Sequence, residues 1–459
     1  MEQGSVFKKL FNTAIAAALS SVLLFPACKP SLDEPAYNSG DADFSRYVAI
    51  GGSYTAGYMD NALSLQSQLQ SFPALLASRF QLAGGGTFKQ PLVNPGNGMG
   101  WDFNANRATG RLRIVQKNNC LGALSYLVEP LPPDSSSLAW IGNTGPFQNM
   151  GVPGAKSSNL NSQQFGLPVP AGNPFFRRMA SDRGQQSGFS STILGDAVLS
   201  APSFFTIWLG TTDVYNYALN GGEDLSQNAY DDITGQAAFL TQMNTALTSL
   251  TAGGAKGVIA NVPDITDIPY FNTIPFNGLI LKKAEADSLN VLYATLGLQF
   301  SEGANPYVVR NPGSSTVRQL KPGELVILNT STELLRCNGL GRPTNPLAAF
   351  NVLDLSEVDS IRAVIQGYNA TINSLAGTYD LALADMNTLF KTFKKGILFN
   401  GVEMNAEYLE GGVFSTDGMN PNGRGYALIA NEFIRVINNK YRSNLPPVDV
   451  TSKPGVVFP

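Results

Sequence analysis

The chain has 459 residues, and its 31 lysine and arginine residues against 34 aspartate and glutamate residues give a formal net charge of −3. This balance excludes the strongly basic surface that binds nucleic acid, and a content of 43% hydrophobic and 14% charged residues excludes a disordered chain. The chain contains no histidine, which excludes histidine metal ligands, imidazole acid–base catalysis and an intact Ser-His-Asp triad. We therefore expect a globular protein with a sizeable core and, by default, one domain.

Residues 1–27 have the pattern of a secretory signal peptide. Lys8 and Lys9 precede an apolar stretch that is shorter than the roughly 20 residues a membrane-spanning helix needs. Ala27 directly before Cys28 resembles a bacterial lipoprotein processing site, which predicts lipidation of Cys28 and a tether over residues 28–43. An ordinary signal peptide with an incidental cysteine is the alternative. We expect a cell-envelope protein, anchored to the outer membrane by lipid on its periplasmic or surface face.

The remaining two cysteines, Cys120 and Cys337, leave two possibilities open. In an oxidising envelope they form either a disulfide or two buried free thiols, because a sequence does not show proximity. Two cysteines without a histidine do not make a structural zinc site, so we expect no metal.

Strands that alternate with helices predict a three-layer α/β/α sandwich with a mainly parallel sheet over residues 44–441. Near-continuous apolar runs are typical of parallel strands buried on both faces, and they lie at 44–50, 204–209, 256–262 and 381–384. Helical apolar spacing covers residues 237–250, 358–375 and 425–439.

Three segments fit the alternation poorly. Residues 84–145 and 300–350 read as loop-rich insertions, the second with a hairpin, and residues 442–459 as a C-terminal tail. We expect both insertions to lie over the carboxyl edge of the sheet, where open α/β folds bind ligands. Trp101 in the first insertion, with Tyr215 and Tyr217, is a candidate lining residue of a sugar or acyl cleft, although burial alone explains many aromatic residues.

A hydroxyl stands at the turn between the first strand and the next helix. Gly51 and Gly52 lead into Ser53, at a helix N-terminus that offers unpaired N–H groups and a positive potential. A nucleophile or an anion site can be built there, and a helix cap is the alternative role of Ser53. The turn is not the Gly-x-Ser-x-Gly elbow, because Thr55 takes the place of the second glycine.

Four motifs in order resemble those of the SGNH or GDSL family of serine ester hydrolases. They cover Tyr47 to Tyr58, Asn149 to Ala155, Thr206 to Asp213 and Phe414 to Pro421. The amino-acid sequence of these motifs and of the segments between them is similar to that of lipoprotein members from Bacteroidetes-type bacteria. The resemblance implies a flavodoxin-like fold and ester chemistry without a cofactor, acting on small acyl or acetyl esters of lipids or glycans.

The resemblance also assigns the site residues. It places the nucleophile at Ser53 and an oxyanion hole at Ser53, Gly154 and Thr212, with Thr212 at the position of the family's asparagine. Asp417 stands at the position of the aspartate, but Asn420 stands where the family has its histidine. An amide has no useful basicity at neutral pH, so the serine lacks its proton acceptor.

This substitution leaves two main hypotheses. In the first, the chain is an exported ester hydrolase whose activity is impaired or lost. In the second, it is a pseudoenzyme whose cleft binds an acylated glycan or lipid without turnover. A purely structural envelope role is a third possibility and predicts a featureless cleft.

Other carboxylates near the strand ends are weaker candidates for a functional role. Asp264 and Asp267 follow a buried strand, where a pair of carboxylates binds a cation or substrate hydroxyls, or more simply forms a turn or cap. We expect Asp213 to cap the helix after the third motif. Asp385 and Asn387 are expected to close the turn after the last strand.

Overall fold

A five-stranded sheet in the order β15–β8–β7–β1–β6 lies at the centre of the molecule, and all four pairings are parallel. Its strands are β1 (Tyr47–Gly51), β6 (Asn149–Gly151), β7 (Phe204–Trp208), β8 (Lys256–Ala260) and β15 (Ala382–Ala384). The strands β1 and β7 are buried along their whole length, because helices cover both faces of the sheet. The predicted α/β fold is confirmed.

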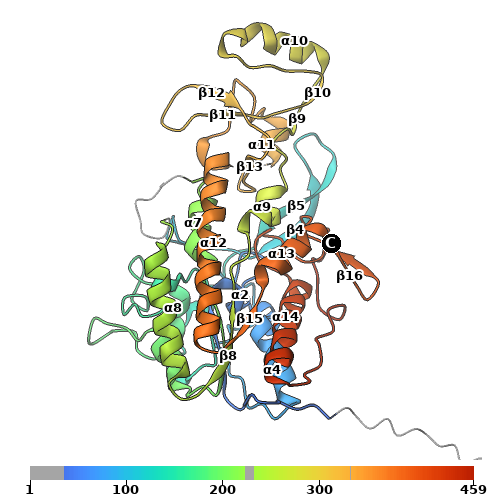
Figure 1. Ribbon diagram of the computed structural model, residues 1–459. Helices are drawn as coiled ribbons and strands as arrows, with labels where there is room; N and C mark the ends of the chain where they lie inside the picture. The colour runs from blue at the N-terminus through green and yellow to red at the C-terminus, as the bar shows by residue number, and fades with distance from the viewer. Residues whose placement is uncertain (1–35, 223–231, 331) are drawn as a thin grey trace, which may run out of the picture. The chain divides into compact units, whose positions relative to one another are not determined.

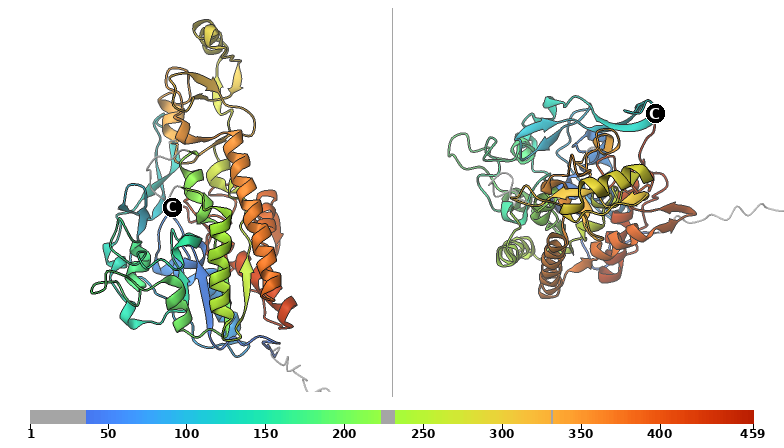
Figure 2. Two further views of the ribbon diagram at one scale, coloured as in Figure 1. Left: turned by 60° about the vertical axis from the view of Figure 1, so that its left-hand side comes forward. Right: turned by 90° about the horizontal axis from the view of Figure 1, so that it is seen from above.

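Helices form the two outer layers (Figures 1 and 2). One face carries α4 (Phe72–Gln81), α13 (Met386–Lys395) and α14 (Gly423–Tyr441), and the other carries α6 (Ile193–Leu199), α8 (Gln236–Thr251) and α12 (Leu355–Thr378). A stacked aromatic pair joins neighbouring helices on each face. The rings of Phe72 and Phe433 stack at 4.7 Å between α4 and α14, and those of Phe239 and Tyr368 at 4.0 Å between α8 and α12.

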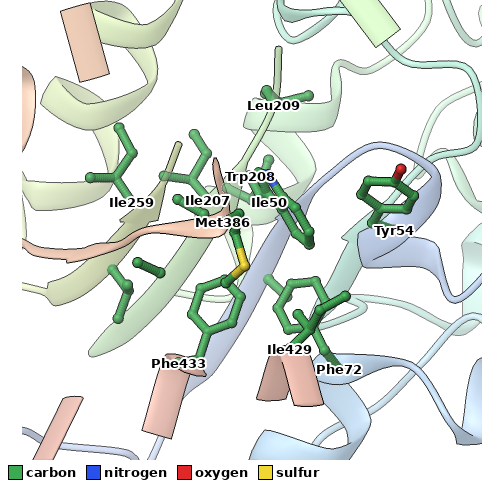
Figure 3. Packing of buried hydrophobic residues seen from close by; sticks show 14 of the residues in the cluster. Ile50, Tyr54, Phe72, Ile207, Trp208, Leu209, Ile259, Met386, Ile429 and Phe433 are labelled. Atoms are coloured by element: carbon green, nitrogen blue, oxygen red, sulfur yellow. The ribbon is translucent and has the colours of Figure 1, made fainter. Parts of the chain in front are cut away.

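The core beside β1 and β7 is built from side chains that the strands point alternately to the two faces. Figure 3 shows Ile50, Ile207 and Ile259 from three adjacent strands, with Phe72 and Phe433 from the helices packed below. Trp208 packs edge-on against Phe72, at 5.7 Å between ring centroids. This packing holds the carboxyl ends of β1 and β7 in one fixed arrangement.

The long helices extend beyond their predicted ranges because polar caps, rather than apolar spacing, set their ends. The helix expected over 358–375 begins at Leu355, after a capping box in which Asp354 accepts from the Glu357 N–H at 2.9 Å and Glu357 accepts from the Asp354 N–H at 2.6 Å. The helix expected over 425–439 begins at Gly423, where Asn422 accepts two backbone N–H groups.

Shorter elements complete the sheet connections. They are α2 (Ser53–Ala56), α3 (Leu65–Leu69), α5 (Pro174–Met179), α7 (Thr212–Leu219), α9 (Pro269–Asn272), β16 (Ile397–Phe399) and β17 (Val402–Met404). Single-turn 3₁₀ segments lie at Ser135–Leu138, Gly142–Thr144, Ser157–Asn159, Ile265–Asp267, Ala294–Leu296 and Ala349–Asn351.

The first insertion forms two antiparallel hairpins within its loops. One pairs β2 (Gly100–Asp102) with β3 (Arg107–Thr109), and the other pairs β4 (Leu112–Asn118) with β5 (Leu124–Pro130). The second insertion begins earlier than the expected residue 300, because its own small core takes in residues from Ile274 to Val352, with Val308, Val326 and Leu347 at its centre. Its elements are β9 (Leu279–Leu281), α10 (Lys283–Leu292), β10 (Gly303–Asn305), β11 (Val308–Arg310), β12 (Val317–Gln319), β13 (Leu325–Val326), α11 (Thr332–Cys337) and β14 (Val352–Leu353).

A disulfide between Cys120 and Cys337 joins the two insertions, with their Cα atoms 6.2 Å apart. It connects the loop between β4 and β5 to the end of α11. Of the two states left open by the sequence, the paired one is therefore the state of the structure.

The computed structural model describes residues 36–222, 232–330 and 332–459. Tyr37–Pro459 form one compact unit, so the end of the expected tether and the whole of the expected tail belong to it. The Asp41 N–H donates to the Tyr441 carbonyl at 2.7 Å, and Val448 and Val450 are buried. The predicted signal peptide and Cys28 lie outside the described residues. Within the described ranges, none of the helices combines the length and apolar character needed to cross a membrane.

Candidate active site

Ser53 is the first residue of α2, directly after β1. Gly52 is the N-cap residue, and no side chain caps this helix, so Ser53 does not have the capping role that was its alternative. Its Oγ instead accepts a hydrogen bond from the Gly154 N–H at 3.4 Å. The strand, turn and helix thus present the hydroxyl at the carboxyl edge of the sheet, facing one of the predicted oxyanion donors.

A hydrogen bond to the preceding carbonyl orients the Gly154 N–H toward the serine, at a position that fits only glycine. Gly154 has φ +78°, and a Cβ there would meet the Phe103 ring at 2.5 Å, so the position suits only glycine. The buried Asn173 donates from Nδ2 to the Pro153 carbonyl at 2.8 Å. Because C=O and N–H point in opposite directions across a trans peptide, holding the Pro153 carbonyl turns the Gly154 N–H toward Ser53.

Thr212 lies beside the serine turn. It is the first residue of α7, after β7, and its Oγ1 lies 3.2 Å from the position that a Cβ on Gly52 would occupy. A hydroxyl here is able to donate one hydrogen bond into the pocket that Gly154 also lines.

Asp417 and Asn420 are hydrogen-bonded to each other. The Asn420 Nδ2 donates to the Asp417 Oδ2 at 3.0 Å, and the Asn420 N–H donates to Oδ1 at 2.8 Å. Oδ1 also accepts from the Met419 N–H at 2.8 Å, and Oδ2 from the Asn61 N–H at 2.8 Å. Asn420 is 6% exposed. Among the described residues, none hydrogen-bonds to the Asn420 Oδ1, and Ser53 makes no hydrogen bond to Asn420.

A tight turn over Met59–Ala62 holds the loop that carries Asp417. Asp60 and Asn61 have φ values of 55° and 57°, a left-handed conformation that costs non-glycine residues on the order of 1 kcal/mol each. The Asp60 Oδ1 accepts from the Thr416 N–H at 3.1 Å and from its hydroxyl at 2.8 Å. The hydrogen bonds of Asp60 and Asn61 therefore hold the segment that carries Asp417 in place.

Ser53, Gly154, Thr212 and Asn420 all line one pocket with a volume of about 150 Å³. The described residues that line it include no lysine, arginine, aspartate or glutamate. Aromatic side chains form much of the wall, from Tyr54, Tyr58, Trp101, Phe103, Trp208 and Tyr215. Trp101 and Tyr215 line this pocket, whereas Tyr217 does not.

The phenols in the wall do not replace the missing base. Burial raises the pKa of Tyr54, Tyr58 and Tyr215, and the nearby charge of Asp417 raises the pKa of each further. These groups are therefore protonated and neutral at neutral pH. The Tyr215 hydroxyl is buried and has no hydrogen-bond partner among the described residues.

The prediction that Asp213 caps a helix is wrong. The N-cap of α7 is Thr211, and the Asp213 carboxylate instead accepts from the Ser157 N–H at 3.0 Å and from its hydroxyl at 2.5 Å. A fully buried carboxylate needs such donors, and the loop after Gly154 supplies them. Burial still raises the pKa of Asp213, against the effect of the Ser157 hydrogen bonds.

Asp264 and Asp385 have the turn and cap roles favoured for them, whereas the Asp267 carboxylate forms an ion pair instead. Asp264 accepts from the Thr266 N–H at 3.0 Å and pairs with Arg362 at 3.1 Å, while Asp267 pairs with Lys394 at 2.5 Å. Asp385 caps α13 by accepting from the Thr388 N–H at 3.0 Å. In the same turn, the Asn387 N–H donates to the Asn261 Oδ1 at 2.8 Å.

Three residues of the site carried no signal in the sequence. Phe103, Asn173 and Asn61 act through contacts with residues far away in the chain. For Asn61, the one available hint was the Asp-Asn pair of a two-residue turn, since both residue types tolerate positive φ.

Comparison with known proteins gives structural similarity without a sequence match. No family model and no curated protein matches the chain. The chain is similar to a lipase/acylhydrolase from Enterococcus faecalis, with 10% identity, a TM-score of 0.31 and coverage of 88% of this chain and 98% of that one. It is also similar to a GDSL-like lipase from Parabacteroides merdae, with 9% identity, a TM-score of 0.33 and coverage of 88% and 99%. A third structure, a gut microbial diltiazem-metabolizing enzyme, has 11% identity and a TM-score of 0.31, with coverage of 88% and 48%.

Proposed function

We propose that this chain is an SGNH/GDSL hydrolase-like protein whose pocket binds an uncharged acyl ligand while ester hydrolysis is impaired or lost. The observation that carries the proposal is Asn420, bonded to Asp417 and lining the pocket of Ser53 at the position of the family's histidine. An amide there keeps the packing and the bond to the aspartate. It has no proton-accepting nitrogen to offer to the serine hydroxyl.

The rest of the pocket supports binding. Its neutral, aromatic lining suits an apolar acyl group, and the donors at Gly154 and Thr212 suit a carbonyl oxygen. The four motifs and the α/β fold support membership of the family. An acylated glycan or lipid of the cell envelope is the ligand class that this family resemblance favours.

The expected loss of rate is large. Removing the histidine of a serine triad costs on the order of 10⁶ in kcat, which corresponds to about 8 kcal/mol of transition-state stabilisation. A residual rate on the order of 10³ to 10⁴ over water can persist from the oxyanion donors and binding. A slow esterase is therefore a second candidate function, because the contact between the Gly154 N–H and Ser53 is retained.

Hydrolysis of 4-nitrophenyl butyrate by the purified chain distinguishes the binding function from the slow esterase. The chain as it stands should match its Ser53→Ala variant, and Asn420→His should gain hydrolysis that the double variant Ser53→Ala/Asn420→His lacks. Hydrolysis by the unmodified chain that disappears in Ser53→Ala would establish the slow esterase and reject the binding function.

The cell-envelope placement has its own test. Export and lipidation of Cys28 would tether the folded unit to the outer membrane, close to acylated glycans and lipids. Metabolic labelling with a palmitate analogue should mark the chain and not the Cys28→Ser variant. Equal labelling of the two would reject the lipid anchor.

A further inference from the structure

The orientation of the Asn420 amide determines which hydrogen-bonding atom faces the pocket. The Asp417 carboxylate accepts and does not donate, so it takes the amide nitrogen, at 3.0 Å. The Oδ1 is then the remaining polar atom of a side chain that is 6% exposed and lines the pocket. Among the described residues, none satisfies this oxygen.

Donors stand elsewhere around the same pocket. The Gly154 N–H points at the Ser53 Oγ from 3.4 Å, and the Thr212 hydroxyl lines the same wall. These groups suit a carbonyl oxygen of the ligand. The pocket thus combines these donors with the Asn420 acceptor, and the described residues that line it include no charged side chain. Such a lining suits a neutral ligand that carries both a C=O and a donor.

An amide oxygen differs from an imidazole nitrogen in one respect that matters for the ligand. A catalytic imidazole accepts the serine proton and then donates it from the same nitrogen to the leaving oxygen. The Asn420 Oδ1 accepts at every stage and never donates. The alkoxy oxygen of an ester would face it with lone pairs only, whereas the N–H of a secondary amide would donate to it.

We propose that the pocket selects N-acyl compounds, in which a secondary amide replaces the ester, over O-acyl esters of the same shape. The inference rests on the proposed function, because it assumes that the ligand's acyl group lies between Ser53 and Asn420. It names a specificity-determining residue, Asn420, and a ligand class, the secondary amide, which occurs in N-acetylated glycans and in N-acylated lipids.

Binding of N-benzylacetamide and benzyl acetate to the full chain, followed by ligand-observed NMR, tests the preference. The N–H of the amide donates to the Asn420 Oδ1, whereas the alkoxy oxygen of the ester opposes it with a second acceptor. N-benzylacetamide should therefore bind about tenfold more tightly than benzyl acetate. N-benzyl-N-methylacetamide, an amide without an N–H, should bind no better than the ester. Equal affinity for N-benzylacetamide and benzyl acetate, or absence of amide binding, would overturn the proposal.

Two variants separate the role of Asn420 from general damage. Asn420→Leu, which keeps the shape and removes the Oδ1, should reduce the preference to less than about twofold. Thr212→Val should weaken both probes alike and keep their ratio, because it removes a donor that serves either carbonyl. A ratio that Asn420→Leu leaves intact would overturn the assignment. The three-probe comparison on the unmodified chain decides the matter if Asn420→Leu does not fold.

The outcome does not depend on whether the chain hydrolyses esters. Ser53-dependent cleavage of benzyl acetate would reject the binding function, and the affinity ratio would then be measured in the Ser53→Ala variant. Methyl β-N-acetylglucosaminide and N-octylacetamide distinguish the two sources of the ligand. Binding of the sugar indicates an N-acetylated glycan, binding of the octyl amide alone indicates an N-acyl lipid, and binding of neither would overturn the ligand class.

Discussion

Replacement of Gly154 by alanine tests the geometry of the oxyanion side of the pocket. The new Cβ would stand at φ +78° and 2.5 Å from the Phe103 ring, well inside the contact distance of two carbons. Left-handed backbone costs an alanine about 1–2 kcal/mol, and overpacking against a neighbouring ring about 1–3 kcal/mol. We therefore expect Gly154→Ala to lower the free energy of unfolding by about 2–5 kcal/mol.

A double-mutant cycle separates the two costs. Phe103→Ala removes the ring that the new methyl would meet, and the backbone cost remains. In that background, Gly154→Ala should therefore cost only about 1–2 kcal/mol. Urea denaturation of the four proteins gives the coupling energy. A coupling near zero, or a single-variant cost below about 1 kcal/mol, would refute the packing of Phe103 over Gly154.

Three further changes have defined outcomes. Tyr215→Phe removes a buried hydroxyl without a partner among the described residues, so it should raise the free energy of unfolding by about 1 kcal/mol. A lower free energy of unfolding, measured by urea denaturation, would contradict this. Burial raises the pKa of Asp213, so its carboxyl contributes stability that is present below the ordinary aspartate pKa and is lost as the pH rises through the raised value. Asp213→Asn should therefore cost more at about pH 4 than at about pH 7, and the reverse order would contradict the raised pKa. Replacing Cys120 and Cys337 by serine should lower the free energy of unfolding by about 2–4 kcal/mol, measured in urea against the parent under oxidising conditions, and an unchanged value would contradict the cross-link.

The sequence was sufficient for the parts of the site that follow local rules. An apolar run followed by Gly51 and Gly52 predicts a buried strand and a tight turn, and parallel strands bring their carboxyl ends to one edge. That rule places Ser53 after β1, Gly154 after β6 and Thr212 after β7, and all three line the same pocket. Asp417 and Asn420 are three residues apart, so the hydrogen bond between them is also a local contact.

The residues that orient these groups were not predictable, because their partners are remote in the chain. Asn173 acts on the Pro153 carbonyl, and Phe103 reaches Gly154 from a hairpin of three-residue strands. Short strands in a glycine-rich insertion leave little periodic pattern. For Asp213, the sequence predicted a local role that the structure does not show. Its place in the first turn of α7 suggests a helix cap, but its side chain turns toward the N–H and hydroxyl of Ser157 in a neighbouring loop.

The central claim, that Ser53 is not activated because Asn420 replaces its base, is tested most directly by labelling with a fluorophosphonate and measuring the intact mass. We expect no adduct on the unmodified chain under conditions in which Asn420→His acquires one adduct at Ser53. Rapid stoichiometric labelling of Ser53 in the unmodified chain would contradict the claim, because it would require a base that the uncharged lining of the pocket does not supply.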